Sequence, residues 1–165
     1  MRRYAEDTAV PISRSRGEID TLLRAWGAQG IQWTDDFEHD RVQLRFLWPR
    51  GEQRFMARFT LHLPTRVELE PEAIDRHTRR ISPGKLQALL DGRGRREHRV
   101  LALWLKAALN AVDSGLVEAE TIFLPFLEDR NGHTVAEIAL PKLDLLLKGS
   151  GMRLLGSPSD AKEMT

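Results

Sequence analysis

The sequence predicts an α+β fold with an N-terminal helix, an antiparallel β-hairpin or three-stranded meander, and a helical C-terminal half. Three observations lead to this prediction. Apolar residues recur at helical spacing after residue 15, they alternate with polar residues along 41–63, and they occupy almost every side of a helix over 97–114. This order of patterns favours helices packed on one antiparallel sheet.

The first predicted helix covers about 15–27. It begins where Ser15 and Glu18 have the spacing of a capping box, a hydroxyl three residues before a glutamate. Gly27 stands where a helix commonly ends. One face carries apolar residues at the i, i+3, i+4 and i+7 positions, namely Ile19, Leu22, Leu23 and Trp26.

Two strands with one buried face are predicted on either side of a turn at 49–52, and a short strand at 31–33 precedes them. A two-residue loop at Arg50–Gly51 sets Phe46 opposite Phe55. The same register pairs Leu44 with Ala57 and Val42 with Phe59, so that these apolar side chains share one face. The opposite face carries four arginines: Arg41, Arg45, Arg54 and Arg58.

The segment 65–96 is predicted as two weak helices and a joint. The first helix covers 72–80 and is rich in arginine, and Ser82–Pro83 interrupts it. The second helix ends at Leu90. Two glycines then make residues 92–96 a flexible joint.

Most of the remaining chain up to residue 148 is predicted to be helical. The helix over 97–114 leaves only a narrow polar stripe, so we expect it to be central and buried. A helix over 117–127 follows, and a turn at 129–132 leads into the last helix. The capping box of that last helix is Thr134 with Glu137.

Composition favours one domain, predicted over 13–148, with a flexible arm at 1–12 and a flexible tail at 149–165. No apolar run approaches the roughly 18 residues that cross a bilayer, so no contact with a membrane is predicted. The N-terminus lacks the apolar stretch of a secretory signal. Cysteine is absent, which excludes disulfides and agrees with the cytoplasmic location that we expect.

No catalytic residue, cofactor or metal site is predicted. The chain carries no Walker, GxGxxG, GxSxG or HExxH motif. The acidic stretch DDFEHD at 35–40 contains oxygen ligands of the type that Mg²⁺ prefers. A solvated hairpin loop has the same composition, and we favour that interpretation.

Charge is distributed unevenly along the chain, although the net charge is only +1. Residues 75–106 contain nine Lys and Arg against three acidic residues, whereas 113–144 contain seven acidic residues against two basic ones. Arginines at the entry of the long helix are unfavourable, because a helix N-terminus carries partial positive charge. They need a counter-anion, either a phosphate or a carboxylate of the same chain. The arginines of this basic segment are Arg76, Arg79 and Arg80 at helical spacing, then Arg93, Arg95, Arg96 and Arg99.

Two stretches, SRSRGEIDTLLRAWGA at 13–28 and RVLALWLKAALNAVDSGLVEAETIFLPFL at 99–127, resemble a family of small proteins carried by bacterial phages, prophages and integrative elements. The resemblance extends over about residues 10–147. It rests on an arginine-rich entry, an apolar helix ending at DSG, and an acidic and apolar helix before an NG turn. It implies a mobile-element setting with DNA-processing or counter-defence genes as neighbours, and it implies no catalytic residues.

These observations favour a non-catalytic accessory protein that binds the phosphate backbone of DNA or RNA through the arginines of the basic segment. The arginines of the hairpin would form a second contact surface. The alternative is a protein–protein adaptor or inhibitor of the counter-defence type that acts on a host or phage protein. Its surface would be the acidic residues Glu118, Glu120, Glu128 and Asp129. The sequence leaves the oligomeric state open.

Overall fold

The computed structural model describes residues 8–149 and confirms the α+β prediction. An N-terminal helix precedes three strands, and the C-terminal half is helical. Residues 1–7 of the predicted arm and 150–165 of the predicted tail lie outside the described residues. In chain order the elements are α1 (Ile12–Trp26), β1 (Gly30–Asp36), β2 (Arg41–Arg50), β3 (Gln53–His62), α2 (Arg66–Ala73), α3 (Pro83–Asp113), α4 (Ala119–Phe123), the 3₁₀ helix η1 (Leu124–Phe126) and α5 (Val135–Gly149).

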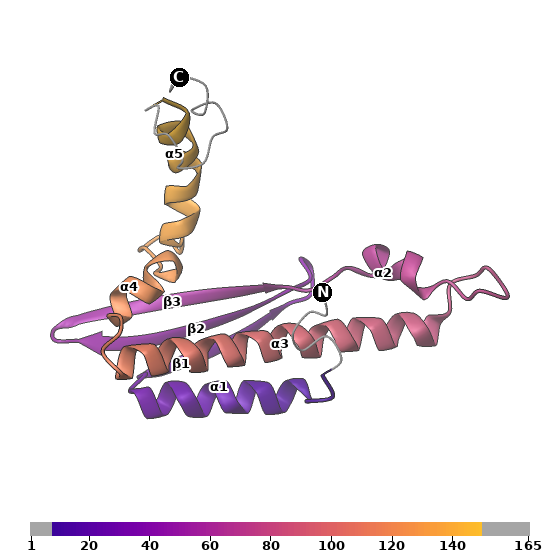
Figure 1. Ribbon diagram of the computed structural model, residues 1–165, viewed down its shortest axis with the longest axis horizontal. Helices are drawn as coiled ribbons and strands as arrows, with labels where there is room; N and C mark the ends of the chain where they lie inside the picture. Colours follow the sequence, from indigo (N-terminus) through magenta and orange to yellow (C-terminus); the bar gives the residue numbers. More distant parts are fainter. Residues whose placement is uncertain (1–7, 150–165) are drawn as a thin grey trace, which may run out of the picture.

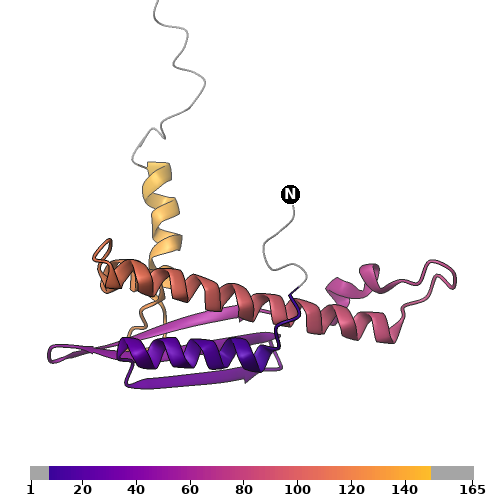
Figure 2. The ribbon, with the colours of Figure 1, turned by 60° about the horizontal axis from the view of Figure 1, so that its bottom comes forward.

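The sheet is an antiparallel meander in the order β1-β2-β3, and α1 and α3 lie side by side against one of its faces (Figures 1 and 2). The core lies between these two layers. Its fully buried members come from every layer and include Ile19 and Leu23 of α1, Leu44 and Phe46 of β2, and Leu105 of α3. The predicted inward face of the hairpin is therefore confirmed.

The register of the hairpin differs from the predicted one by two residues. Phe46 pairs with Ala57 and Trp48 pairs with Phe55, because the loop consists of Gly51 and Glu52 and not of Arg50 and Gly51. Gly51 has a φ of 59°, a left-handed conformation that glycine adopts at little cost in a two-residue hairpin loop. A shift of two residues leaves every side chain on its predicted face.

Helix α1 begins at Ile12, so the predicted capping box at Ser15 is wrong. The carbonyl of Pro11 accepts hydrogen bonds from the backbone N–H groups of Arg14 and Ser15 at 3.1 and 3.2 Å, which places Ser15 inside the first turn. Its side chain is fully buried and its hydroxyl has no partner among the described residues. Gly27 ends the helix with a φ of 105°, as predicted.

Helix α3 is one continuous helix of 31 residues. The sequence had predicted a helix ending at Leu90, a flexible joint at 92–96 and a separate helix over 97–114. Gly92 and Gly94 lie inside α3. A glycine in a helix interior costs only about 0.5–1 kcal/mol relative to alanine, which the packing on either side offsets. One reason for glycine is local: a Cβ built on Gly94 would lie 3.3 Å from Cδ1 of Ile12, so the missing side chain lets the start of α1 approach α3 closely.

The arginine-rich helix predicted over 72–80 is also absent. Helix α2 begins at a capping box formed by Thr65 and Glu68 and ends at Ala73. Residues 74–82 form a loop. Helix α2 packs on the first turns of α3, where Leu69, Ala73 and Leu86 make a second small core. This loop forms the end of the elongated molecule opposite the turn of the β2–β3 hairpin (Figure 1).

Two helices are less covered than their sequences predicted. Helix α3 buries the side that faces the sheet, but Val100 is 40% exposed, and Trp104 is 37% exposed although its ring packs against Phe59 of β3, so the helix is not buried all round. Helix α5 projects from the sheet and packs mainly against η1 (Figures 1 and 2). The helix predicted over 117–127 is divided into α4 and η1, because Pro125 has no N–H to continue the α-helical hydrogen bonds.

Candidate nucleic-acid interface

The predicted basic residues lie in three separate places. Arg41, Arg45, Arg54 and Arg58 lie on the sheet, Arg93, Arg95, Arg96 and Arg99 lie inside α3, and Arg76, Arg79 and Arg80 lie in the loop 74–82. Because α3 is continuous, the arginines at 93–99 are neither in a glycine-rich loop nor at a positive helix end. The predicted repulsion between these arginines and the partial positive charge of a helix N-terminus, which suggested a bound phosphate, is therefore absent at 93–99.

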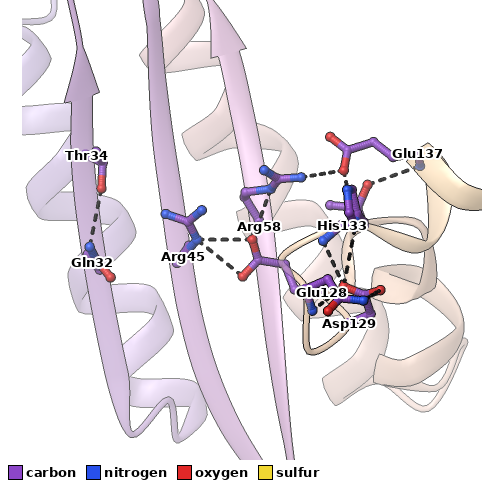
Figure 3. Close-up of polar contacts among 10 residues, drawn as sticks. Gln32, Thr34, Arg45, Arg58, Glu128, Asp129, His133 and Glu137 are labelled. Carbon is purple, nitrogen blue, oxygen red and sulfur yellow. Dashed lines mark hydrogen bonds and ion pairs between the residues drawn. The ribbon is translucent and has the colours of Figure 1, made fainter.

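Two of the four sheet arginines, Arg45 and Arg58, are held by carboxylates from the C-terminal half (Figure 3), whereas Arg54 is exposed and forms no ion pair among the described residues. Glu128 has a side chain only 9% exposed, and Nε of Arg45 donates hydrogen bonds to its two carboxylate oxygens at 3.1 and 3.2 Å. Nε of Arg58 lies 3.1 Å from Glu128 Oε1 as an ion pair, and Nη2 of Arg58 donates to Glu137 at 2.6 Å. Arg45 and Arg58 therefore attach the segment after η1 to the sheet.

Backbone hydrogen bonds strengthen this attachment. The N–H of Glu128 donates to the carbonyl of Met56 at 2.8 Å, and Leu127 forms an isolated bridge with Ala57. The predicted capping box at the start of α5 is confirmed, with Thr134 and Glu137 bonded to each other in both directions. The N–H of Thr134, together with Arg58, holds the pKa of Glu137 below its ordinary value.

Arginines at the start of the central strand β2 and on α3 also meet carboxylates. Nε of Arg41 donates to Asp36 at 2.7 Å. Hydrogen bonds from His39 and then Arg41 lower the pKa of Asp36 to about 2. In α3, Arg99 is hydrogen-bonded to Glu18 of α1, and Nη2 of Arg93 lies 3.5 Å from Glu72 of α2.

The two other predicted arginines of α3 are partly covered. Nε of Arg95 donates to the backbone carbonyl of Thr8 at 3.4 Å. The side chain of Arg96 is only 16% exposed, and its Nη1 lies 3.9 Å from Glu97. Helix α3 therefore does not present its arginines as one open row to a nucleic-acid backbone.

The loop 74–82 presents its arginines differently, and we call it the tip loop. Asp75 organises it: Oδ1 accepts hydrogen bonds from the N–H of His77 at 2.9 Å and from the N–H of Thr78 at 2.8 Å. The backbone closes the loop, since the N–H of Asp75 donates to the carbonyl of Arg80 at 2.9 Å. Ile74 and Ile81 form a bridge at its base.

Three arginines extend from this ordered loop. Arg76, Arg79 and Arg80 are all exposed, and among residues 8–149 none of them forms an ion pair. Arg79 has a φ of 53°, which is uncommon for a residue other than glycine and shows that the loop has a specific conformation. The pKa of Asp75 is lowered by the hydrogen bonds from Thr78 and His77, which keeps the organising carboxylate charged.

Most acidic residues of the alternative hypothesis already have partners within the chain. Glu128 is enclosed by two arginines, and Glu120 lies 2.7 Å from Nη1 of Arg50. Asp129 accepts hydrogen bonds from the N–H groups of His133 and Asn131 within its own turn, and these bonds lower the pKa of Asp129. Glu118 is exposed at the N-cap of α4, two residues before Glu120.

The acidic stretch at 35–40 is divided between the end of β1 and a turn. Asp35 binds Arg16, whose hydrogen bonds lower the pKa of Asp35, and Asp36 binds Arg41. Within the described part of the chain, no group of three or more His, Asp or Glu side chains is arranged to hold a metal ion.

Sequence reasoning missed one polar cluster, at the junction of α1, β1 and α3. The guanidinium group of Arg16 donates hydrogen bonds to the carboxylate of Asp35 and to the imidazole of His98. Its Cζ atom also lies 4.8 Å from the centre of the Trp33 ring. Nε1 of Trp33 donates to Asp20 at 3.0 Å. Because Arg16 and His98 are 82 positions apart, no local pattern in the sequence signals their contact.

Searches of the chain against protein-family models, curated proteins and solved structures gave no match. Each helix that the structure describes is too short or too polar to cross a membrane.

Proposed function

We propose that the protein is a non-catalytic accessory protein of a phage or mobile element that binds the phosphate backbone of DNA or RNA through Arg76, Arg79 and Arg80 of the tip loop. One observation carries the proposal. The other predicted arginines largely meet carboxylates of the same chain, whereas an ordered loop at the end of the molecule holds these three free of ion pairs among the described residues. Guanidinium groups are well suited to phosphate contacts.

The proposal is narrower than the one the sequence favoured. Arg45, Arg58, Arg93 and Arg99 now have structural partners within the chain, and removing them from the interface reduces the expected number of phosphate contacts. Binding through three arginines would be weak and independent of base sequence, because phosphate contacts carry no sequence information. Arginines of the same chain pair with Glu120 and Glu128, two of the four acidic residues of the adaptor hypothesis, so we favour the nucleic-acid contact over that function.

The test is fluorescence anisotropy of labelled single- and double-stranded DNA and RNA between about 50 and 200 mM salt. The unmodified protein should bind and lose affinity with salt. A variant with Arg76, Arg79 and Arg80 changed to Ala should bind weakly, and the slope of log K against log salt for duplex DNA should fall by about 2–3, since each phosphate contact contributes about 0.9.

A control with the same loss of charge separates the loop from the net charge of the protein. Arg24, Arg130 and Lys142 are exposed and lie on α1, in the turn before α5 and on α5. Changing these three to Ala should leave binding nearly unchanged. Equal loss in both variants would show that only net charge matters, and no binding at the lowest salt would refute the proposal.

A further inference from the structure

A groove of about 590 Å³ runs between α1 and α3 and takes no part in the proposed nucleic-acid contact. Its volume is in the range of sites that hold small molecules, about 300–1,000 Å³. Leu22 of α1 and Ala102 and Leu103 of α3 give it an apolar lining. The groove is therefore able to cover an apolar group that would otherwise face water.

The polar groups along the groove are mainly cationic. Arg14, Arg99 and Lys106 line it, and Glu18 is its one carboxylate. Arg99 is hydrogen-bonded to Glu18, and Nε of Arg14 lies 4.0 Å from the same side chain, so one acidic group faces two guanidinium groups. Lys106 is exposed and makes no ion pair among the described residues. The groove thus has a positive charge that a bound anion would complement.

Gly17 leaves space in this groove that the fold does not use. A Cβ built on Gly17 would meet nothing within 4 Å, whereas one built on Gly94 would approach Ile12. Close packing therefore explains Gly94 but not Gly17. A glycine inside a helix costs about 0.5–1 kcal/mol relative to alanine, and at Gly17 no contact with the residues that the structure describes offsets that cost.

We propose that this groove binds a monomeric, single-chain anionic amphiphile such as a fatty-acid carboxylate. The head group lies at Lys106, because Arg14 and Arg99 already face Glu18. The alkyl chain runs from there over Leu103, Ala102 and Leu22 toward Gly17. The apolar lining and the positive charge together select this class over neutral or cationic amphiphiles. A volume of about 590 Å³ is that of a site for one small molecule, so the proposed ligand is the free monomer and not a lipid within a bilayer.

Isothermal titration calorimetry with laurate below its micelle concentration tests this proposal. We expect saturable binding of one laurate per chain, and at least tenfold weaker binding of dodecyl maltoside and dodecyltrimethylammonium. Lys106→Glu should weaken laurate binding at least tenfold, while Arg24→Glu, on the same helix layer but outside the groove, should not. No saturable laurate binding, or equal binding of the three amphiphiles, would overturn the proposal.

A second variant fills the groove without removing charge. Gly17→Phe should abolish laurate binding and leave the unfolding temperature unchanged or higher, because the position is helical and open. Undiminished binding in Gly17→Phe would place laurate elsewhere and refute the site. If Gly17→Phe fails to fold, Lys106→Glu still decides, since Lys106 is exposed. Binding to phosphatidylglycerol vesicles without binding of monomeric laurate would indicate a membrane surface and would also refute the proposal.

Discussion

Arg16 of α1 and His98 of α3 are joined by a hydrogen bond in which Nε–H of the guanidinium donates to Nε2 of the imidazole at 3.2 Å. Nδ1 of His98 lies 2.8 Å from the carbonyl oxygen of Gly94, so this nitrogen carries the proton and donates it. One ring nitrogen donates and the other accepts, which only the neutral imidazole can do. The side chain is 1% exposed. The pKa of His98 is lowered, first by burial and then by the charge of Arg16, although the Gly94 carbonyl opposes the shift.

We therefore predict that the free energy of unfolding decreases as the pH falls through about 6.5, the ordinary histidine value. Below that pH the unfolded chain takes up a proton on His98 that the folded chain does not accept, so acid favours the unfolded state. Urea unfolding at pH 7.5 and pH 5.5 measures this difference, in a range where the carboxylates stay ionised in both states. Replacing His98 with Gln should flatten the dependence and cost about 1–3 kcal/mol, since Arg16 loses a buried partner.

The exposed His62 provides the control for this experiment. A His62→Gln variant should retain the pH dependence of the unmodified protein. Equal unfolding free energies at the two pH values would contradict the tautomer that the Arg16 and Gly94 contacts require.

Glu128 is predicted to be the acidic residue whose loss most weakens the attachment of the C-terminal half to the sheet. Its nearly buried carboxylate faces both Arg45 and Arg58. Removing one member of a buried charge group costs about 3–5 kcal/mol, because the charges that remain are left unpaired. Glu128→Gln should fall near the lower end of that range, since Arg45 is 26% exposed and water can reach it. Thermal and urea unfolding measure the loss.

Glu118→Gln is the matched control for Glu128→Gln, because it removes the same charge from an exposed position. It should change the free energy of unfolding by less than about 0.5 kcal/mol. A Glu128→Gln protein as stable as the control would show that the arginines find water or other acceptors without cost.

Two helix-interior glycines should respond in opposite directions to larger side chains. Gly17→Ala should stabilise the protein by about 0.5–1 kcal/mol, because alanine favours the helix and its methyl group meets open space. Gly94→Val should destabilise it by about 1–3 kcal/mol, because the added atoms press on Ile12 and on the junction with α1. Urea unfolding of both variants beside the unmodified protein tests the pair. If both variants are more stable than the unmodified protein, Ile12 moves away from the side chain added at position 94 at little energetic cost.

The elements that the sequence predicted correctly are those whose position depends on interactions between residues close together in the chain. The alternation along β2 and β3 identified the buried face, Gly27 identified the end of α1, and Thr134 with Glu137 identified the start of α5. The hairpin register was wrong by two residues because alternation has a period of two and cannot detect such a shift. The conformation of Gly51 decides the register, and composition alone does not fix which two residues form the loop.

The errors in the basic segment have a different physical origin. Two glycines suggested a joint in α3, yet their cost to a helix is small beside the burial of Leu86 on one side and Leu101 and Leu105 on the other. The partners of the arginines come from distant parts of the chain: Arg45 and Glu128 are 83 positions apart, and Arg99 and Glu18 are 81 apart. Charge counts along the sequence cannot show which arginines such contacts neutralise.

Asp75 offers a prediction that separates an ordered phosphate-binding loop from simple attraction between opposite charges. Asp75→Ala removes a negative charge beside Arg76, so attraction alone predicts tighter binding to nucleic acid. The proposed function predicts the opposite, because the loss of the hydrogen bonds to His77 and Thr78 releases the loop. Re-ordering a mobile arginine costs about 1 kcal/mol, which corresponds to roughly fivefold weaker binding.

Asp91→Ala, which removes an exposed acid from α3, supplies the control with the same change in charge. It should bind at least as tightly as the unmodified protein in anisotropy titrations at fixed salt. If both variants bind more tightly to the same extent, the order of the tip loop plays no part in binding.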